Sequence, residues 1–220
     1  MIKNVIFDWS GTLSDDITPV YIATMGVFRE LGLSSLTFEE FKREFTLPYM
    51  KFYRKFKKDA DKEEIERLFY QEIVLAGNPE PFPKAREVLE FLKKEDIRIA
   101  LLSSHIQKKL IEEIRDYGFQ RFFVEVNGGV HDKVEAILEI LGKNCFRPNE
   151  TLYVGDMAHD IEAGKKAGAI TVAVSWGYQP KEKLLKEHPD FLIENLADLE
   201  RIILKLNGRR SAKSKNKQTG

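Results

Sequence analysis

The chain has 220 residues, and 43 % of them are hydrophobic, which is enough for a sizeable core in one domain or in a domain with an insert. Its 35 basic and 35 acidic residues cancel, but five of the basic residues lie beyond Gly208, where there is no acid. The remaining body is therefore acidic, which argues against nucleic-acid binding and leaves contact of the basic tail with an anionic partner as a weak alternative. With one cysteine and only a three-residue apolar run before Asp8, we expect no internal disulfide, signal peptide or membrane span, and a cytoplasmic location.

Short apolar runs without polar alternation predict strands that are buried on both faces. In chain order these runs are residues 5–7, 97–102, 122–126, 152–154, 171–174 and 191–193. Amphipathic helical patterns lie between or after them, near residues 84–95, 105–117, 132–142, 159–167 and 195–206. Such alternation predicts an α/β fold with a doubly wound, Rossmann-like parallel sheet.

The segment from residue 16 to residue 80 interrupts this alternation. It shows no strand pattern, and its aromatic and aliphatic residues recur at helical spacing until Pro79, Pro81 and Pro83 mark the return to the sheet. We therefore expect an α/β catalytic core of residues 1–15 and 81–207, a helical cap of residues 16–80 inserted after the first strand, and a basic disordered tail of residues 208–220.

Residues with chemical potential follow four of the predicted strands. Asp8 ends the first strand, Ser103 follows the second, Lys133 begins the helix after the third, and Asp156 with Asp160 follows the fourth. Singly, each also fits turn or cap chemistry; Ser103 or Ser104, for example, would cap the next helix. Together they converge, because a parallel sheet binds ligands outside the carboxyl ends of its strands.

Three converging carboxylates predict a cation site, since they repel one another unless a cation joins them. Oxygen ligands with room for water and a substrate phosphate suit Mg²⁺. Lys133 and Ser103 would then hold a phosphate. Asp8, as a carboxylate nucleophile, would attack phosphorus to give an aspartyl-phosphate that water hydrolyses.

The ordered segments FDWSGTL, LLSS, DKVEA and VGDMAHDIEAGKKAG resemble the haloacid dehalogenase-like hydrolase superfamily. The helical insert resembles its type C1 cap. The last segment resembles the phosphoglycolate phosphatase-like branch, as does the LP of FTLPYMKF, although that branch usually has glycine where Thr46 stands.

The resemblance implies a role for each site residue. Asp8 is the nucleophile and a Mg²⁺ ligand, and the main-chain carbonyl of Ser10 is a second ligand. Asp156 is a third, and Asp160 supports the metal or Lys133. Phosphate or substrate binding is expected of Trp9, Ser103, Ser104 and Lys133.

Ser10 departs from the pattern, because the phosphatases of this superfamily have a second aspartate there as general acid and base. A serine hydroxyl does not perform this role near pH 7, and losing such a group typically costs about 10²–10⁴ in rate. The first interpretation is a slow or specialised Mg²⁺-dependent hydrolase of a small phosphorylated metabolite, with Asp15, Asp16 or His105 as candidate proton carriers.

Two alternatives remain. One is a phosphonatase-like or acyl-phosphate hydrolase, whose leaving group needs no acid. DWSGT differs by one hydroxyl from the phosphonatase DWAGT, and Lys51 or Lys55 would supply the Schiff base, although Tyr49 falls where that lysine is expected. The other alternative is a non-catalytic protein that binds a phosphorylated metabolite. The substrate's identity and the oligomeric state do not follow from the sequence.

Overall fold

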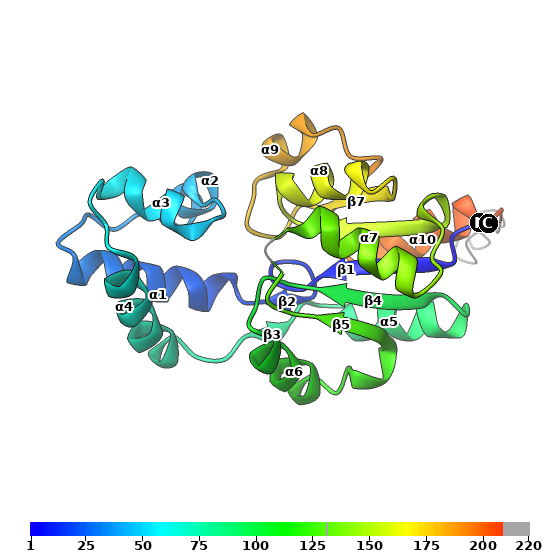
Figure 1. Ribbon diagram of the computed structural model, residues 1–220, viewed down its shortest axis with the longest axis horizontal. Coiled ribbons are helices and arrows are strands. Elements are labelled where there is room, and N and C mark those ends of the chain that lie inside the picture. Colours follow the sequence, from blue (N-terminus) through cyan, green and yellow to red (C-terminus); the bar gives the residue numbers. More distant parts are fainter. Residues whose placement is uncertain (131, 209–220) are drawn as a thin grey trace, which may run out of the picture.

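The computed structural model describes residues 1–130 and 132–208 (Figure 1). Its main sheet has six parallel strands in the order β5-β4-β1-β6-β7-β8. The strands are β1 (Asn4–Asp8), β4 (Arg98–Leu102), β5 (Phe123–Asn127), β6 (Thr151–Gly155), β7 (Ile170–Val174) and β8 (Phe191–Ile193). The predicted doubly wound fold and all six predicted strands are confirmed, with ends that differ by up to one residue.

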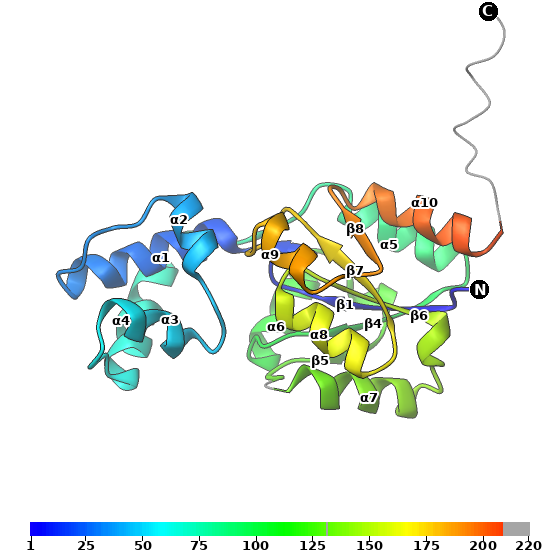
Figure 2. The ribbon, with the colours of Figure 1, turned by 90° about the horizontal axis from the view of Figure 1, so that it is seen from above.

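Helices cover both faces of the sheet, as Figure 2 shows from above. One face packs against α5 (Ala85–Lys94), α6 (Gln107–Asp116) and α10 (Ala197–Leu206). The other packs against α7 (Lys133–Lys143), α8 (Ala158–Lys166) and the short α9 (Lys181–Lys186). The central strands β1 and β6 are buried along their whole length because both faces are covered. Their apolar runs therefore follow from the layer structure.

Four helices form a separate layer beyond the carboxyl ends of the strands (Figures 1 and 2). They are α1 (Ile17–Glu30), α2 (Phe38–Glu44), α3 (Tyr49–Phe56) and α4 (Lys62–Leu75). Aromatic residues fill their interior, and Phe28, Phe41 and Phe52 are almost fully buried. The helical cap inserted after the first strand is thus present. Met157 and Tyr178 of the α/β core join its hydrophobic cluster.

A small antiparallel pair, which the sequence patterns did not predict, lies at the base of the cap. Ser14–Asp15 (β2) pairs with Glu80–Pro81 (β3), so the two chain crossings between core and cap run side by side. Two residues are too few for a period-2 pattern, which explains why the pair was missed. Helix α9 was not predicted either, because its six residues are too few to show a helical repeat.

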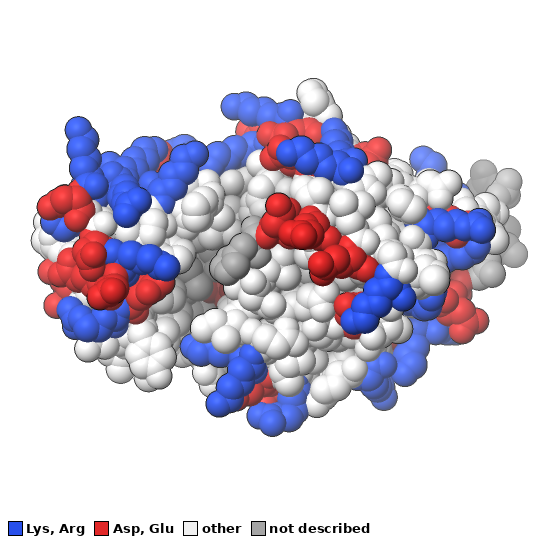
Figure 3. All heavy atoms as spheres, viewed as in Figure 1, with Lys and Arg blue, Asp and Glu red and all other residues white. Residues whose placement is uncertain are grey.

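The surface and the basic tail bear on partners. Lysine and arginine side chains alternate with acidic ones over both cap and core on the face shown in Figure 3. The predicted tail, from residue 209 on, lies outside the described residues. Within the described part of the chain, no helix combines the length and apolar character needed to cross a membrane.

Candidate active site

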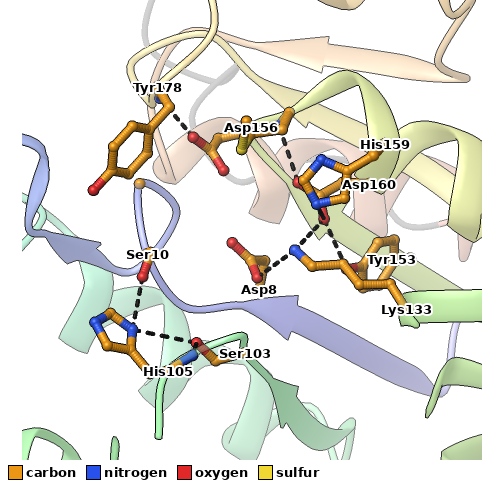
Figure 4. A network of polar contacts seen from close by, with 12 residues as sticks. Asp8, Ser10, Ser103, His105, Lys133, Tyr153, Asp156, His159, Asp160 and Tyr178 are labelled. Atoms are coloured by element: carbon orange, nitrogen blue, oxygen red, sulfur yellow. Dashed lines mark hydrogen bonds and ion pairs between the residues drawn. The ribbon is translucent and has the colours of Figure 1, made fainter. Parts of the chain in front are cut away.

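The structure brings the four sequence signals to one edge of the sheet. Asp8 ends β1, Ser103 follows β4, and Asp156 follows β6. Lys133 is the first residue of α7, whose N-cap, Asp132, accepts hydrogen bonds from the next main-chain N–H groups. Because the strands are parallel, all of these positions lie at their carboxyl ends, where Figure 4 shows their side chains.

Three carboxylates form the centre of the site. Asp8, Asp156 and Asp160 each offer an oxygen, and these atoms lie within 4.8 Å of one another. All three residues are buried, with at most 4 % of their surface exposed. The Lys133 ammonium donates to Asp8 Oδ1 at 2.8 Å and to Asp160 Oδ1 at 2.6 Å, and it is itself 8 % exposed (Figure 4).

Neighbouring groups fix Asp160 and Asp156 in place. Asp160 is the third residue of α8, where its carboxylate accepts the Met157 N–H at 3.0 Å in a capping-box arrangement. The Tyr153 hydroxyl donates to the same carboxylate at 3.0 Å. Asp156 accepts the Tyr178 N–H at 2.5 Å. Sequence patterns did not single out Tyr153 or Tyr178, because one reads as an ordinary strand residue and the other as a loop residue.

Two glycines allow the chain to approach Asp156 closely. A Cβ at Gly11 would lie 2.3 Å from Asp156 Oδ2, and one at Gly177 would lie 2.2 Å from Asp156 Cβ. Gly11 also has a φ of +70°, which a residue with a Cβ adopts only with strain. The glycine in the DWSGT turn is therefore required both by its backbone conformation and by the Asp156 side chain.

Burial and mutual repulsion determine the charge state of the cluster. Burial, and to a lesser degree the Asp160 charge, raises the pKa of Asp8 to about 7, although Lys133 opposes the rise. Burial and the other two carboxylates raise the pKa of Asp156 well above its usual value. Asp160 behaves differently: burial alone would raise its pKa, but Lys133 and His159 lower it below the ordinary value. Lys133 and Asp160 thus form the stable ion pair.

The donor set fits a divalent cation. When all three carboxylates are ionised, Lys133 balances one of them and leaves two negative charges without a counter-ion, which is the charge that a single Mg²⁺ balances. All the side-chain donors are oxygens, as this hard cation prefers. A bound cation would lower the raised pKa values of Asp8 and Asp156 toward the ordinary value of an aspartate.

The Ser10 hydroxyl has a separate set of neighbours. Ser10 Oγ lies 2.8 Å from His105 Nδ1, and His105 Nε2 lies 3.8 Å from Asp16 Oδ2. Two of the three candidate proton carriers, Asp16 and His105, are therefore next to Ser10. The third, Asp15, belongs to β2 and pairs with Glu80.

Ser103 and Ser104 differ in their surroundings. Ser103 is fully buried, and its hydroxyl accepts the His105 N–H at 3.1 Å, whereas Ser104 is exposed. Neither side chain caps α6, whose N-cap is Ile106 without a side-chain hydrogen bond. The interpretation of Ser103 or Ser104 as the N-cap residue of the next helix is therefore wrong. The Ser103 hydroxyl instead stabilises the turn that carries His105.

Trp9 does not present its side chain to the site. The indole is fully buried, donates to Glu113 Oε2 at 2.6 Å and stacks on Tyr117. A role for Trp9 in phosphate binding would have to come from its main chain. In the cap, Lys51 and Lys55 are both exposed, and Tyr49 donates to Glu66 on α4. A lysine that forms a Schiff base needs burial to lower its pKa, and neither residue has it.

Comparisons with known proteins agree with this fold. The haloacid dehalogenase-like hydrolase family matches residues 5–174. The chain is 30 % identical to the phosphoglycolate phosphatase of Aquifex aeolicus, with 92 % of this chain and 97 % of that protein covered. It is 28 % identical to the pyrophosphatase PpaX of Listeria welshimeri, covering 92 % and 96 %. A haloacid dehalogenase-like family protein from Streptococcus pneumoniae has the same fold, with a TM-score of 0.79, 19 % identity, and 92 % and 98 % covered.

The chain belongs to the haloacid dehalogenase-like hydrolase family. Within it, the chain groups with the phosphoglycolate phosphatase-like branch, as the ordered motifs predicted. The prediction of an enzyme of the phosphatase type is confirmed at this level.

Proposed function

We propose that this protein is a Mg²⁺-dependent phosphatase for a small phosphorylated metabolite and that Asp8 is its nucleophile. The observation that carries the proposal is the buried cluster of Asp8, Asp156, Asp160 and Lys133 at the carboxyl edge of the sheet. Relatives named as a phosphoglycolate phosphatase and a pyrophosphatase support the substrate class, a phosphoester or anhydride of a small molecule.

Each residue has a distinct task in this proposal. Asp8, Asp156 and the main-chain carbonyl of Ser10 would hold Mg²⁺, which supplies charge neutralisation between the nucleophile and the phosphate. Lys133 stabilises negative charge on the transferred phosphoryl group, and Asp160 keeps Lys133 charged and aimed at Asp8. The Asp8 oxygen bonds to phosphorus as the ester oxygen leaves, and water then releases phosphate from Asp8.

We further propose that helices α1 to α4 form a cap domain, approximately residues 16–80, that closes over the site and selects the substrate. Phe45 of the cap stacks on Tyr178 with ring centroids 5.1 Å apart, and the Tyr178 N–H is bonded to Asp156. The same loop therefore contacts the cap and a proposed metal ligand.

The test is phosphate release from phosphoglycolate, pyrophosphate and acetyl phosphate, with and without Mg²⁺. We expect Mg²⁺-dependent turnover that falls at least about a thousandfold in Asp8→Asn. The matched control is Asp96→Asn, an exposed aspartate that precedes β4 at the opposite edge of the sheet, and it should behave as the native protein. Rapid quenching and mass spectrometry should detect phosphate on Asp8.

Two results would contradict the proposal. Turnover retained in Asp8→Asn would exclude this residue as the nucleophile. Phosphate binding without turnover of any substrate would favour the non-catalytic binding protein.

A further inference from the structure

The loop after β4 places an imidazole against the serine that replaces the expected aspartate. Ser10 and His105 are 95 residues apart in the chain, yet Ser10 Oγ lies 2.8 Å from His105 Nδ1. Figure 4 shows this pair on the opposite side of Asp8 from Lys133 and Asp160. The Ser10 hydroxyl is therefore hydrogen-bonded from the side of Asp8 that Lys133 and Asp160 do not occupy.

Hydrogen bonds of the main chain hold His105 in this position. Its N–H donates to the buried Ser103 hydroxyl at 3.1 Å, and its carbonyl accepts the Gly129 N–H at 2.6 Å. The Ser103 hydroxyl also lies 3.3 Å from His105 Nδ1. These contacts hold the main chain of His105 and bring its Nδ1 within hydrogen-bond distance of both the Ser103 and the Ser10 hydroxyls.

Asp16 completes the arrangement on the other ring nitrogen. It occupies the N-cap position of α1, where an aspartate normally accepts an N–H of the first turn, but its side chain makes no such bond. Instead, Oδ1 accepts the Gly11 N–H at 3.1 Å and Oδ2 faces His105 Nε2 at 3.8 Å. The side chain is 6 % exposed, so its charge acts in a weakly screened environment.

We propose that Ser10, His105 and Asp16 form a proton relay that takes the place of the missing carboxylic acid. This inference rests on the proposed phosphatase function. Ser10 is the catalytic residue, because its hydroxyl would meet the leaving oxygen. His105 and Asp16 are positioning residues that act through it. The support for the relay is the set of contacts among these three side chains. The relay uses the Ser10 hydroxyl, whereas the proposed metal ligand is a different atom, the Ser10 main-chain carbonyl oxygen.

The proton balance covers both half-reactions. In the first, the bond from Asp8 to phosphorus forms and the bond from phosphorus to the alcohol oxygen breaks. The Ser10 hydroxyl gives its proton to that oxygen and takes one from His105 Nδ1, and the product is the alcohol. In the second, water attacks phosphorus and the bond to Asp8 breaks. The water proton passes through Ser10 back to His105 Nδ1, while Asp16 holds the Nε2–H side of the ring throughout.

The relay would widen the range of substrates that the enzyme hydrolyses. Without an acid, only weakly basic leaving groups such as carboxylates and phosphates would depart readily, so the good substrates would be acyl phosphates and phosphoanhydrides. With the relay, alkyl phosphate esters become substrates as well, because the alkoxide is protonated as it leaves.

The decisive experiment compares kcat/KM for phosphoglycolate and for acetyl phosphate in His105→Asn. The amide keeps a hydrogen-bonding group near Ser10 but does not shuttle a proton. We expect kcat/KM to fall by about a hundredfold or more for the alkyl ester. For acetyl phosphate it should stay within about threefold, because the first half-reaction then needs no acid. The matched control is His188→Asn, an exposed histidine in the loop before β8, which should leave both values unchanged.

A second variant separates the relay from a structural role of His105. In Ser10→Asp, the new carboxylate carries the proton itself, so adding His105→Asn should then cost less than about tenfold on the ester. A penalty of the same size in both backgrounds would overturn the relay, as would equal losses on both substrates or no loss on the ester. Failure of the phosphatase proposal is distinct: native protein would show no turnover, or turnover would survive Asp8→Asn.

Discussion

The two sides of Asp8 are built on different principles. On the carboxylate side, Asp156, Asp160 and Lys133 place three charges close to Asp8 in a buried space. On the hydroxyl side, the Ser10 and Ser103 hydroxyls lie within hydrogen-bond distance of His105 Nδ1, and the Asp16 carboxylate faces the other ring nitrogen at 3.8 Å. The first arrangement is electrostatically incomplete and calls for a cation. In the second arrangement, each side chain already has a polar partner within the protein.

Among variants of the residues that flank Asp8, the largest effect is expected on the carboxylate side, in Lys133→Met. Loss of a donor aimed at developing charge should lower kcat/KM by about 10²–10³. Because the variant leaves buried carboxylates without their lysine, the metal-free protein should also lose about 3–5 kcal/mol of stability, measured by urea unfolding. Mg²⁺ should restore part of that loss.

The control for this variant is Lys166→Met, which removes an exposed lysine from an i,i+4 pair with Glu162. Its stability should change by less than about 0.5 kcal/mol. If Lys133→Met were as stable as this control in the absence of metal, the carboxylate side would not depend on its lysine.

Asp156→Asn should have the opposite effect to Lys133→Met on the stability of the metal-free protein. Asp156 has its pKa raised by burial and by its two carboxylate neighbours, so removing its charge relieves repulsion. The metal-free variant should therefore be at least as stable as the native protein, since the amide oxygen still accepts the Tyr178 N–H. The stabilisation by Mg²⁺, about 2.7 kcal/mol at a hundred times the dissociation constant in the native protein, should be largely lost.

Thermal unfolding with and without Mg²⁺ measures both changes, with Asp96→Asn as the control. An undiminished Mg²⁺ effect in Asp156→Asn would show that the cation binds elsewhere.

The carboxylate side and the hydroxyl side of Asp8 also differ in how far the sequence could predict them. Asp8, Lys133, Asp156 and Asp160 follow directly after strands or begin helices, so the parallel topology alone brings them to one edge. The sheet was equally predictable, because strands covered on both faces read as continuous apolar runs. His105 is different. Its contact with Ser10 depends on a turn closed by the Ser103 hydroxyl, and loop conformation of this kind has no periodicity to reveal it.

The direction in which a side chain points was the second feature that the sequence could not predict. Trp9 lies next to the nucleophile in the chain, but its indole enters the core between Tyr117 and Glu113. Asp16 occupies the N-cap position of α1, yet its carboxylate turns back toward Gly11 and His105. In both cases neighbouring elements, and not the local sequence, decide where the side chain points.

Ser10→Asp makes the hydroxyl side resemble the pattern usual in the family and should produce a small effect. Restoring a full general acid to a site without any would raise the rate by about 10²–10⁴. If the relay already carries the proton, kcat for phosphoglycolate should rise by less than about tenfold, partly because the new carboxylate lies close to Asp16. Steady-state phosphate release measures this, and a gain above a hundredfold would indicate that the native hydroxyl side does not transfer protons.

The smallest effects are expected in a matched pair of tyrosine variants, one for each side. Tyr153→Phe removes a hydroxyl that donates to the Asp160 carboxylate at 3.0 Å. Tyr117→Phe removes one that is hydrogen-bonded to Ser14 Oγ at 2.8 Å, beneath the hydroxyl side. Hydrogen bonds to a charged group contribute about 1.5–3 kcal/mol and neutral ones about 0.5–1.5 kcal/mol. Urea unfolding should therefore show the larger loss in Tyr153→Phe. Equal losses would count against a charged Asp160 carboxylate in the folded protein, because a charged acceptor should make the Tyr153 hydrogen bond the stronger one.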